Sequence, residues 1–150
     1  MKTVLDILKS KGNTVWSIAP GAPVFDALSL MAEKEIGALP VIENGNLLGI
    51  ISERDYARKV ILQGKFSRET TVKEIMSQAV IYVTPSYTVE ECMALMTNKR
   101  IRHLPVYDSE TLQGIISIGD VVKAEIEEKE FVIDQLMHYI KDTPAIETDK

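Results

Sequence analysis

The chain has 150 residues, of which 45% are hydrophobic and 26% charged, and its formal net charge is −5. These values are typical of one folded domain, and the acidic balance argues against a general nucleic-acid-binding surface. The single cysteine, Cys92, excludes an internal disulfide, and no apolar run approaches the roughly 20 residues that span a bilayer. We therefore expect a cytoplasmic protein with no membrane or nucleic-acid partner.

The first predicted elements are a strand and a helix. A run of β-favouring residues at 15–18 predicts a strand that ends ahead of Pro20, because a residue before proline favours extended backbone. From Val24 the apolar residues recur at i, i+3, i+4 and i+7, which predicts an amphipathic helix.

A hairpin and a second helix follow. Residues 39–42 and 47–51 are predicted strands, and the Asn44-Gly45 pair between them is a strong signal for a two-residue hairpin turn. The returning strand leads into Ser52-x-x-Asp55, a sequence that typically opens a helix.

The same order of elements returns 65 residues later. Between Pro20 and Arg58, 15 of the 39 positions are identical to the residue 65 positions further on, where ordinary composition gives about 2 or 3. The second copy therefore predicts a strand at 80–83, a helix from Val89 and strands at 104–107 and 112–116. Its turn, Asp108-Ser109-Glu110, is expected to be looser than the first.

The repeat defines the expected organisation of the chain. Residues 3–62 and 71–126 form the two copies, residues 127–141 an extra helix and residues 142–150 a polar tail. One copy of about 60 residues is marginal alone, so two copies are expected to bury each other's hydrophobic faces. The expected class is α/β or, more narrowly, α+β, with helices on one face of small mixed sheets.

The repeated segments resemble the cystathionine-β-synthase (CBS) domain, and the two copies resemble the tandem pair called a Bateman module. The resemblance rests on Leu-Pro-Val and Gly-Ile-Ile-Ser-x-x-Asp in both copies and covers residues 3–126. Residues 98–105 are similar to stand-alone CBS-pair proteins of bacteria and to single-pair CBS proteins of plant organelles.

The resemblance implies a fold and a ligand. The fold is two β-α-β-β-α copies packed about a pseudo-two-fold axis, with two clefts between them, and two such modules often pair. The ligand is an adenosine compound such as AMP, ADP, ATP, NAD(H) or S-adenosylmethionine, whose binding regulates a partner protein. Magnesium would accompany only a bound triphosphate.

The Ser-x-x-Asp sequences have two interpretations. A carboxylate can accept hydrogen bonds from both ribose hydroxyls, and a helix N-terminus suits a phosphate. The same sequence is close to a capping box, in which both side chains only satisfy backbone groups. With the resemblance, we expect Asp55 and Asp120 to hold ribose and Ser52 and Ser117 to meet phosphate or ribose. Gly49 would let the ligand approach the backbone.

Lys99, Arg100, Arg102 and His103 form the only dense basic cluster of the chain. In strand geometry Arg102 and His103 point to opposite sides, so at least one of them can enter a cleft as a phosphate clamp. We expect Lys99, Arg102 and His103 to meet phosphate, and the alternative is a solvated charge run. His103 is not expected to bind a metal.

The two clefts are expected to differ in charge. The first copy has Glu53 and Arg54 where the second has Ile118 and Gly119. Arg54 could reach a phosphate, and Ile118 could press on a base. Arg58 lies one helical turn beyond Arg54, and a solvated arginine pair is the alternative interpretation.

The purine base is expected to lie between apolar side chains and backbone groups. The residues expected to line it are Ile18, Ala38, Leu39, Val83, Thr84 and Leu104. The alternative is that they belong to the hydrophobic core, and for most of them both interpretations can hold.

Enzyme signatures such as G-x-x-x-x-G-K-[ST], G-x-G-x-x-G, H-E-x-x-H and C-x-x-C are absent from the sequence, and Cys92 is expected to be an inert core thiol. No catalytic or metal-binding residue is predicted. We expect a non-catalytic regulatory module that binds an adenosine nucleotide, forms a homodimer and acts on a target protein that the sequence does not identify. A ligand-free interaction scaffold, a nucleotide hydrolase and RNA binding through the basic cluster are the alternatives.

Overall fold

The computed structural model describes residues 1–12, 14–78 and 81–142. Its elements are, in chain order, α1 (Val4–Lys11), α2 (Val24–Lys34), β1 (Ala38–Glu43), β2 (Asn46–Ser52), α3 (Glu53–Tyr56), the π-helix η1 (Ala57–Ile61), α4 (Val72–Ile75), β3 (Ser77–Gln78), α5 (Val89–Lys99), β4 (His103–Asp108), β5 (Thr111–Ser117) and α6 (Ile118–Asp142).

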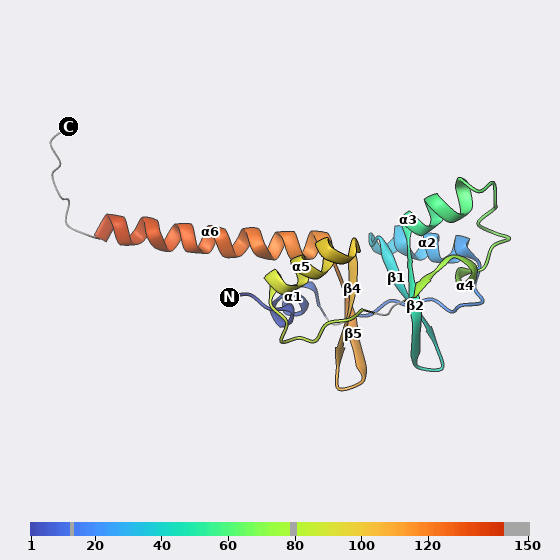
Figure 1. Cartoon of the computed structure of the whole chain (residues 1–150), viewed down its shortest axis with the longest axis horizontal. Coiled ribbons are helices and arrows are strands. Elements are labelled where there is room, and N and C mark those ends of the chain that lie inside the picture. The colour runs from blue at the N-terminus through green and yellow to red at the C-terminus, as the bar shows by residue number, and fades with distance from the viewer. Residues whose placement is uncertain (13, 79–80, 143–150) are drawn as a thin grey trace.

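Two antiparallel hairpins form the centre of the molecule. The hairpins β1–β2 and β4–β5 lie side by side, with α2, α3 and α4 beside the first and α1 and α5 beside the second (Figure 1). Strand β3 extends the first hairpin into the three-stranded sheet β1-β2-β3, and β4-β5 is two-stranded. This arrangement confirms the predicted α+β class.

The two hairpin turns have the same geometry. Asn44 and Gly45 both adopt positive φ, and so do Ser109 and Glu110 in the second copy. Glu43 pairs with Asn46 and Asp108 pairs with Thr111, so each turn has two residues. The prediction of a looser second turn was therefore wrong. The strand pairing imposes the left-handed conformation on Ser109 and Glu110 although neither is glycine.

The predicted opening strands are reduced to single bridges. Ile18 forms one parallel bridge with Val41, and Val83 forms one with Val106. In each case the strand prediction at 15–18 or 80–83 was too long, and Val80 lies outside the described residues. In each case a single residue pairs, because its N–H and its C=O bind the two residues that flank its partner in the strand. The chain then turns away from that strand.

The two hydrophobic cores exchange segments. Val4, Ile7 and Leu8 of α1 are buried in the core of the second copy, with residues such as Val89 and Leu104. Val72 and Ile75 of α4 are buried in the core of the first copy. Matching backbone hydrogen bonds hold the exchanged segments. Val4 N–H donates to the Tyr87 carbonyl, and Val72 N–H donates to the Ala22 carbonyl, both at 2.8 Å.

Helix α6 runs without a break from Ile118 to Asp142. Residues 127–141 are helical, as predicted, but they continue the second copy's last helix instead of forming a separate one. The helix packs on the second copy near its start and then projects from the body (Figure 1). Its projecting part exposes large apolar side chains, namely Phe131, Val132, Ile133, Leu136, Met137 and Ile140.

Candidate functional site

The first cleft lies between the two copies and has a volume of about 550 Å³. The first copy contributes the end of β2, α3 and η1, and the second contributes the residues that join α5 to β4. The lining residues are Ile50, Ser52, Arg54, Asp55, Arg58, Lys59, Ser77, Gln78, Ile81, Arg100, Ile101, Arg102, His103 and Pro105.

The cleft gathers most of the protein's arginines. The chain has five, and four of them line this cleft, while the fifth, Arg68, stacks on the ring of Phe25. Arg54 and Arg58 come from the first copy and Arg100 and Arg102 from the second. Lys59 adds another cation, and among the described residues Asp55 is the only carboxylate in the lining. In a chain of net negative charge, this concentration of guanidinium groups suits a phosphorylated anion.

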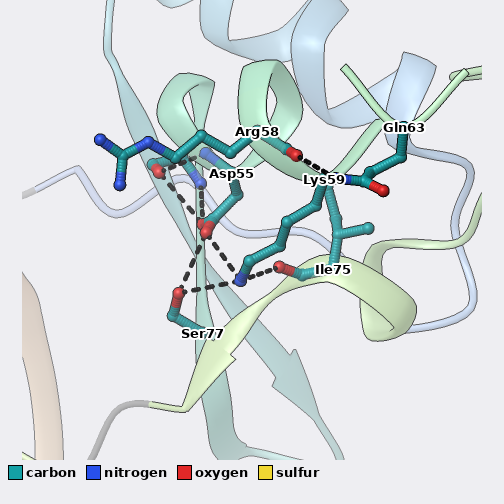
Figure 2. A network of polar contacts seen from close by, with 7 residues as sticks. Asp55, Arg58, Lys59, Gln63, Ile75 and Ser77 are labelled. Carbon is teal, nitrogen blue, oxygen red and sulfur yellow. Dashed lines mark hydrogen bonds and ion pairs between the residues drawn. The ribbon is translucent and has the colours of Figure 1, made fainter. Parts of the chain in front are cut away.

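The carboxylate of Asp55 is the centre of a polar network (Figure 2). Oδ2 accepts from the Ser52 N–H at 2.9 Å and from the Ser52 hydroxyl at 3.0 Å. Oδ1 accepts from the Ser77 hydroxyl at 3.0 Å and forms an ion pair with Lys59 Nζ at 3.1 Å. Asp55 is only 8% exposed.

Ser52 and Asp55 form a complete capping box. The Ser52 hydroxyl accepts from the Asp55 N–H at 3.1 Å, and the Asp55 carboxylate accepts from the Ser52 N–H. Ser117 and Asp120 make the same two contacts at 3.1 and 2.8 Å. The structural role considered for both pairs is therefore present, and both aspartates also line clefts, where a ligand can reach them.

Gly49 does not open the backbone to a ligand as expected. A Cβ at this position would lie 2.5 Å from the Ser77 carbonyl oxygen and 3.0 Å from the sulfur of Met76. The space beside Gly49 is therefore filled by β3, which pairs with β2 there. A side chain at Gly49 would push β3, and with it Ser77, away from Asp55.

The second cleft has a volume of about 240 Å³ and is related to the first by the repeat. Its lining includes Lys11, Trp16, Glu35, Ala38 and Asp120. Within the part of the chain that the structure describes, Lys11 is the only lysine or arginine in this lining, against five in the first cleft. The predicted difference in charge between the clefts is present in the structure.

Asp120 also contacts a lysine. Lys11 Nζ lies 2.8 Å from Oδ2 and donates to the Ile115 carbonyl at 2.7 Å. Burial raises the pKa of Asp120, but the hydrogen bonds from Lys11 and from the Ser117 N–H outweigh it and hold the pKa below its usual range. No described residue donates to Oδ1, so this oxygen can still accept a hydrogen bond.

His103 lies between the two clefts and lines both. Burial, and then the positive charge of Lys11, lower its pKa, while Asp120 and Asp55 act in the opposite direction. The ring is therefore mainly neutral at pH 7. It can contact a ligand in either cleft by hydrogen bonding, but not as a permanent cation.

The other predicted phosphate contacts divide into two groups. Arg54 and Arg102 line the first cleft beside His103, as expected from their positions. Lys99 is exposed on the last turn of α5 and does not belong to the lining of either cleft. Arg100, next to it, does line the first cleft, because its left-handed backbone ends α5 and redirects the chain.

The residues predicted to hold a base lie mostly in the cores. Leu39, Val83 and Leu104 have no exposed surface, so their side chains pack in the interior. Ile18 and Thr84 are half-buried outside the cleft linings, and Ile118 is 44% exposed at the start of α6. Ala38 alone of this group lines a cleft, the second. The apolar surface of the first cleft comes instead from Ile50, Ile81, Ile101 and Pro105.

Sequence reasoning missed the residues that hold the aspartates. Lys59, Ser77 and Lys11 contact Asp55 or Asp120 but were not predicted as site residues. The Asp55–Lys59 pair has the i, i+4 spacing of a helical ion pair and could have been found. Ser77 and Lys11 lie 22 and 109 residues from their partners, and no local pattern connects them.

The described residues offer little for metal or thiol chemistry. Among them, no three His, Cys, Asp or Glu side chains gather as metal ligands. Cys92 is buried in the second core, and burial, with a smaller effect from Glu91, raises the pKa of its thiol to about 11. Every helix in the described part of the chain is too short or too polar to cross a bilayer.

Comparisons with known proteins agree with the duplicated fold. The family model described as CBS domain matches residues 4–62 and 72–127. The mitochondrial CBS domain-containing protein CBSX3 of Arabidopsis thaliana is 41% identical over 149 residues, which cover 93% of this chain and 72% of the relative. A solved structure of a protein with CBS domains from Burkholderia ambifaria has a TM-score of 0.80 and 52% identity, covering 84% of this chain and 95% of that one.

A fold of two interlocked copies with a cleft on either side of their junction defines a tandem, duplicated module. The chain belongs to the CBS domain family, and the resemblance inferred from its repeated segments is confirmed. CBS pairs generally act as regulatory modules. A hexameric CBS-CP12 protein from bloom-forming cyanobacteria shares the fold at 32% identity with a TM-score of 0.75, covering 93% of this chain and 84% of that one.

Proposed function

We propose that this chain is a non-catalytic regulatory module that binds an adenosine nucleotide with its phosphates in the first cleft. The observation that carries the proposal is the collection of Arg54, Arg58, Arg100 and Arg102 in one cavity of about 550 Å³. A volume of this size suits a nucleotide. Membership of the CBS family supports adenosine as the nucleoside.

The cleft also offers surfaces for the other parts of a nucleotide. Ile50, Ile81 and Ile101 provide apolar contacts for a purine ring, and Ser52 at the start of α3 provides a hydroxyl near a helix N-terminus. Because the arginines come from both copies, a bound phosphate would bridge them. Bridging stabilises one relative arrangement of the copies over others, which is what a regulatory ligand must do.

The first test is thermal unfolding of the purified chain with AMP, ADP, ATP, NAD, NADH, S-adenosylmethionine and GTP. A ligand at 100 times its Kd stabilises the fold by about 2.7 kcal/mol, which shifts Tm by several degrees. Arg102→Ala should remove most of the shift, since a hydrogen bond to a charged group contributes about 1.5–3 kcal/mol. Arg68→Ala is the matched control because Arg68 is the arginine outside the cleft.

A shift with adenosine compounds that Arg102→Ala removes and Arg68→Ala retains would support the proposal. If all seven compounds leave Tm unchanged, the second candidate, a ligand-free interaction scaffold, is favoured. The scaffold is supported by the complete capping boxes of Ser52–Asp55 and Ser117–Asp120, which give all four residues a structural role. Release of phosphate from ATP with magnesium would instead indicate a nucleotide hydrolase.

We further propose that the chain forms a homodimer in which α6 contributes a contact. The side chains of Ile133, Leu136, Met137 and Ile140 share one face and are each more than half exposed. Apolar patches of this kind on a projecting helix mark interaction sites. Light scattering should show a mass above the 16.8 kDa of one chain, and Leu136→Glu should lower it. Gln135→Glu, on the opposite face, is the control, and an unchanged mass in Leu136→Glu would refute the α6 contact.

The cellular location and the target stay predictions. A cytoplasmic location was expected from composition, and one relative is a mitochondrial protein of Arabidopsis thaliana. RNA binding that weakens steeply with salt concentration would support the alternative that the basic cluster is a nucleic-acid site.

A further inference from the structure

Each cleft aspartate is held by a lysine that also binds a backbone carbonyl. Lys59 Nζ lies 3.1 Å from Asp55 Oδ1 and donates to the Ile75 carbonyl at 2.9 Å, as Figure 2 shows. Lys11 Nζ lies 2.8 Å from Asp120 Oδ2 and donates to the Ile115 carbonyl at 2.7 Å. The lysine therefore occupies an acceptor position on the same carboxylate that is expected to bind ribose.

The two lysines are not related by the repeat. The position 65 residues beyond Lys59 is Ala124, which is buried in the second core. Lys11 comes instead from α1, the helix that the second copy receives from the start of the chain. Duplication alone therefore does not explain why a lysine contacts the aspartate in both clefts.

The carboxylate of Asp55 has no acceptor position left. An ionised carboxylate offers about four acceptor sites. The Ser52 N–H, the Ser52 hydroxyl, the Ser77 hydroxyl and Lys59 supply four donors. A ribose hydroxyl can bind Asp55 only after Oδ1 has lost a donor, and Lys59 and Ser77 are the donors on that oxygen. The departure of Lys59 frees one acceptor position for such a hydroxyl.

Lys59 is the donor that a phosphate can remove. Its ammonium has three N–H donors, which point to Asp55, the Ile75 carbonyl and, at 3.5 Å, the Ser77 hydroxyl. A nucleotide phosphate in the same cleft carries up to two negative charges and several strong acceptor oxygens, so it competes with Asp55 for the ammonium. An uncharged nucleoside has no group that does this.

We propose that Lys59 is a specificity-determining residue that blocks Asp55 against unphosphorylated nucleosides and moves to the phosphate when a nucleotide binds. This inference rests on the proposed function. Ribose recognition in the first cleft then depends on the phosphate, which makes the site selective for AMP or a larger nucleotide over adenosine. Lys11 has the same effect in the second cleft, but a weaker one, because Asp120 Oδ1 is still able to accept a hydrogen bond.

The test is isothermal titration of adenosine and of AMP into the wild type and Lys59→Met. The variant should bind adenosine about three- to fivefold more tightly, the range set by loss of a partly exposed ion pair. It should bind AMP several-fold more weakly because the phosphate loses a cation. The ratio of the two affinities should therefore fall by about tenfold or more. Lys59→Arg, which keeps the charge, should retain most of the wild-type ratio.

Two controls separate this role from a structural one. Ser77→Ala removes the other donor on Oδ1 without removing a cation, so its effects on adenosine and AMP should have the same sign. Lys73→Met removes an exposed lysine of α4 outside both cleft linings and should change neither. If Lys59→Met loses stability, titration of Lys11→Met gives the same comparison in the second cleft, with a smaller change in the ratio.

The outcomes distinguish the two proposals. One outcome is that AMP binds the wild type and Lys59→Met lowers the affinities for adenosine and AMP by the same factor or leaves both unchanged. The specificity role of Lys59 is then refuted and the nucleotide site stands. If neither AMP, ADP, ATP nor NAD binds the wild type or any variant, the nucleotide site itself is refuted and the role of Lys59 with it.

Discussion

The two clefts have the same framework and opposite electrostatics. Both have Ser-x-x-Asp at the end of a hairpin and a lysine on the aspartate. The residues around this framework differ at equivalent positions: Arg54 corresponds to Gly119, Arg100 to Glu35 and Arg102 to Gly37. Identity between the copies therefore preserves the Ser-x-x-Asp cap, whereas the groups that would select a ligand have diverged.

The concentration of cations in the first cleft has an energetic implication. Like charges repel, and Arg54, Arg58, Arg100 and Arg102 share one cavity whose described lining has a single carboxylate. An anion bound among them would relieve that repulsion as well as accept their hydrogen bonds. The second cleft lacks this repulsion between cations, so the same anion would bind there with a smaller gain in free energy.

The largest effects are expected in the two cores beneath the clefts. Ile51 and Ile116 occupy equivalent, fully buried positions, and replacing either with Ala should destabilise the fold by about 2–5 kcal/mol. Because α1 and α4 are exchanged between the cores, both variants should still unfold in one transition. Urea unfolding followed by fluorescence and circular dichroism tests this.

Ile61→Ala is the control, because Ile61 is exposed and should change stability by less than about 0.5 kcal/mol. Two separate transitions in either core variant would mean that the copies are independent folding units despite the exchange.

The next effect compares the two aspartates. Asp55→Ala removes a buried carboxylate with four donors, so it should cost about 2–3 kcal/mol. Asp120→Ala removes one with contacts to Lys11 and the Ser117 N–H and should cost about 1–2 kcal/mol. Chemical denaturation at pH 7 gives both values. Equal losses would show that the additional donors on Asp55 contribute nothing to stability.

A smaller effect is expected from adding charge to the second cleft. Gly119 corresponds to Arg54, and a Cβ at Gly119 would meet the Ser117 hydroxyl at an ordinary 3.5 Å. Gly119→Arg should therefore fold and raise the affinity of this cleft for AMP by about two- to fivefold, as one additional exposed ion pair would. Titration in an Arg102→Ala background isolates the second cleft. Unchanged affinity would mean that charge does not determine the difference between the clefts.

The smallest effect is the dependence of stability on pH through Asp120. Its pKa is lowered in the folded state, so its contribution is complete above the pKa of the unfolded chain and is lost as the pH falls through the folded value. The difference in unfolding free energy between wild type and Asp120→Asn should be constant from about pH 7 to 5 and shrink by up to about 1 kcal/mol below about pH 4. A difference that grows in acid would contradict this assignment.

Local patterns predicted the elements of the fold better than their contacts. The helix from Val24, the Asn44-Gly45 turn and the 65-residue repeat depend on nearest neighbours and on duplication, and all are present in the structure. The exchange of α1 and α4 was not predicted, because Val4 and Val72 look alike in sequence and only packing shows which core receives each.

The candidate site was predicted in outline. The Ser-x-x-Asp pairs lie at the clefts because each follows directly from the end of a strand, and Arg100, Arg102 and His103 of the basic cluster line the first cleft from the segment that leads from α5 into β4. Residues predicted to contact the base, such as Leu39 and Leu104, are buried in the cores instead. Alternation along a strand does not distinguish a side chain that faces the core from one that lines a cleft. The π-helix that contains Lys59 has no sequence signal of its own, and neither has the contact of Lys11 with Asp120.

Because α6 is one continuous helix, a small rotation of the second copy produces a larger displacement at the far end of the helix. The helix starts at Ile118, directly after the strand that ends in Ser117 of the second cleft, and its 25 residues span about 37 Å. A rotation of the second copy by about 5° would move the far end by about 3 Å, roughly the diameter of a water molecule. A small adjustment around a ligand would thus be amplified at Tyr139 and Ile140, where a partner chain could read it as a change in spacing.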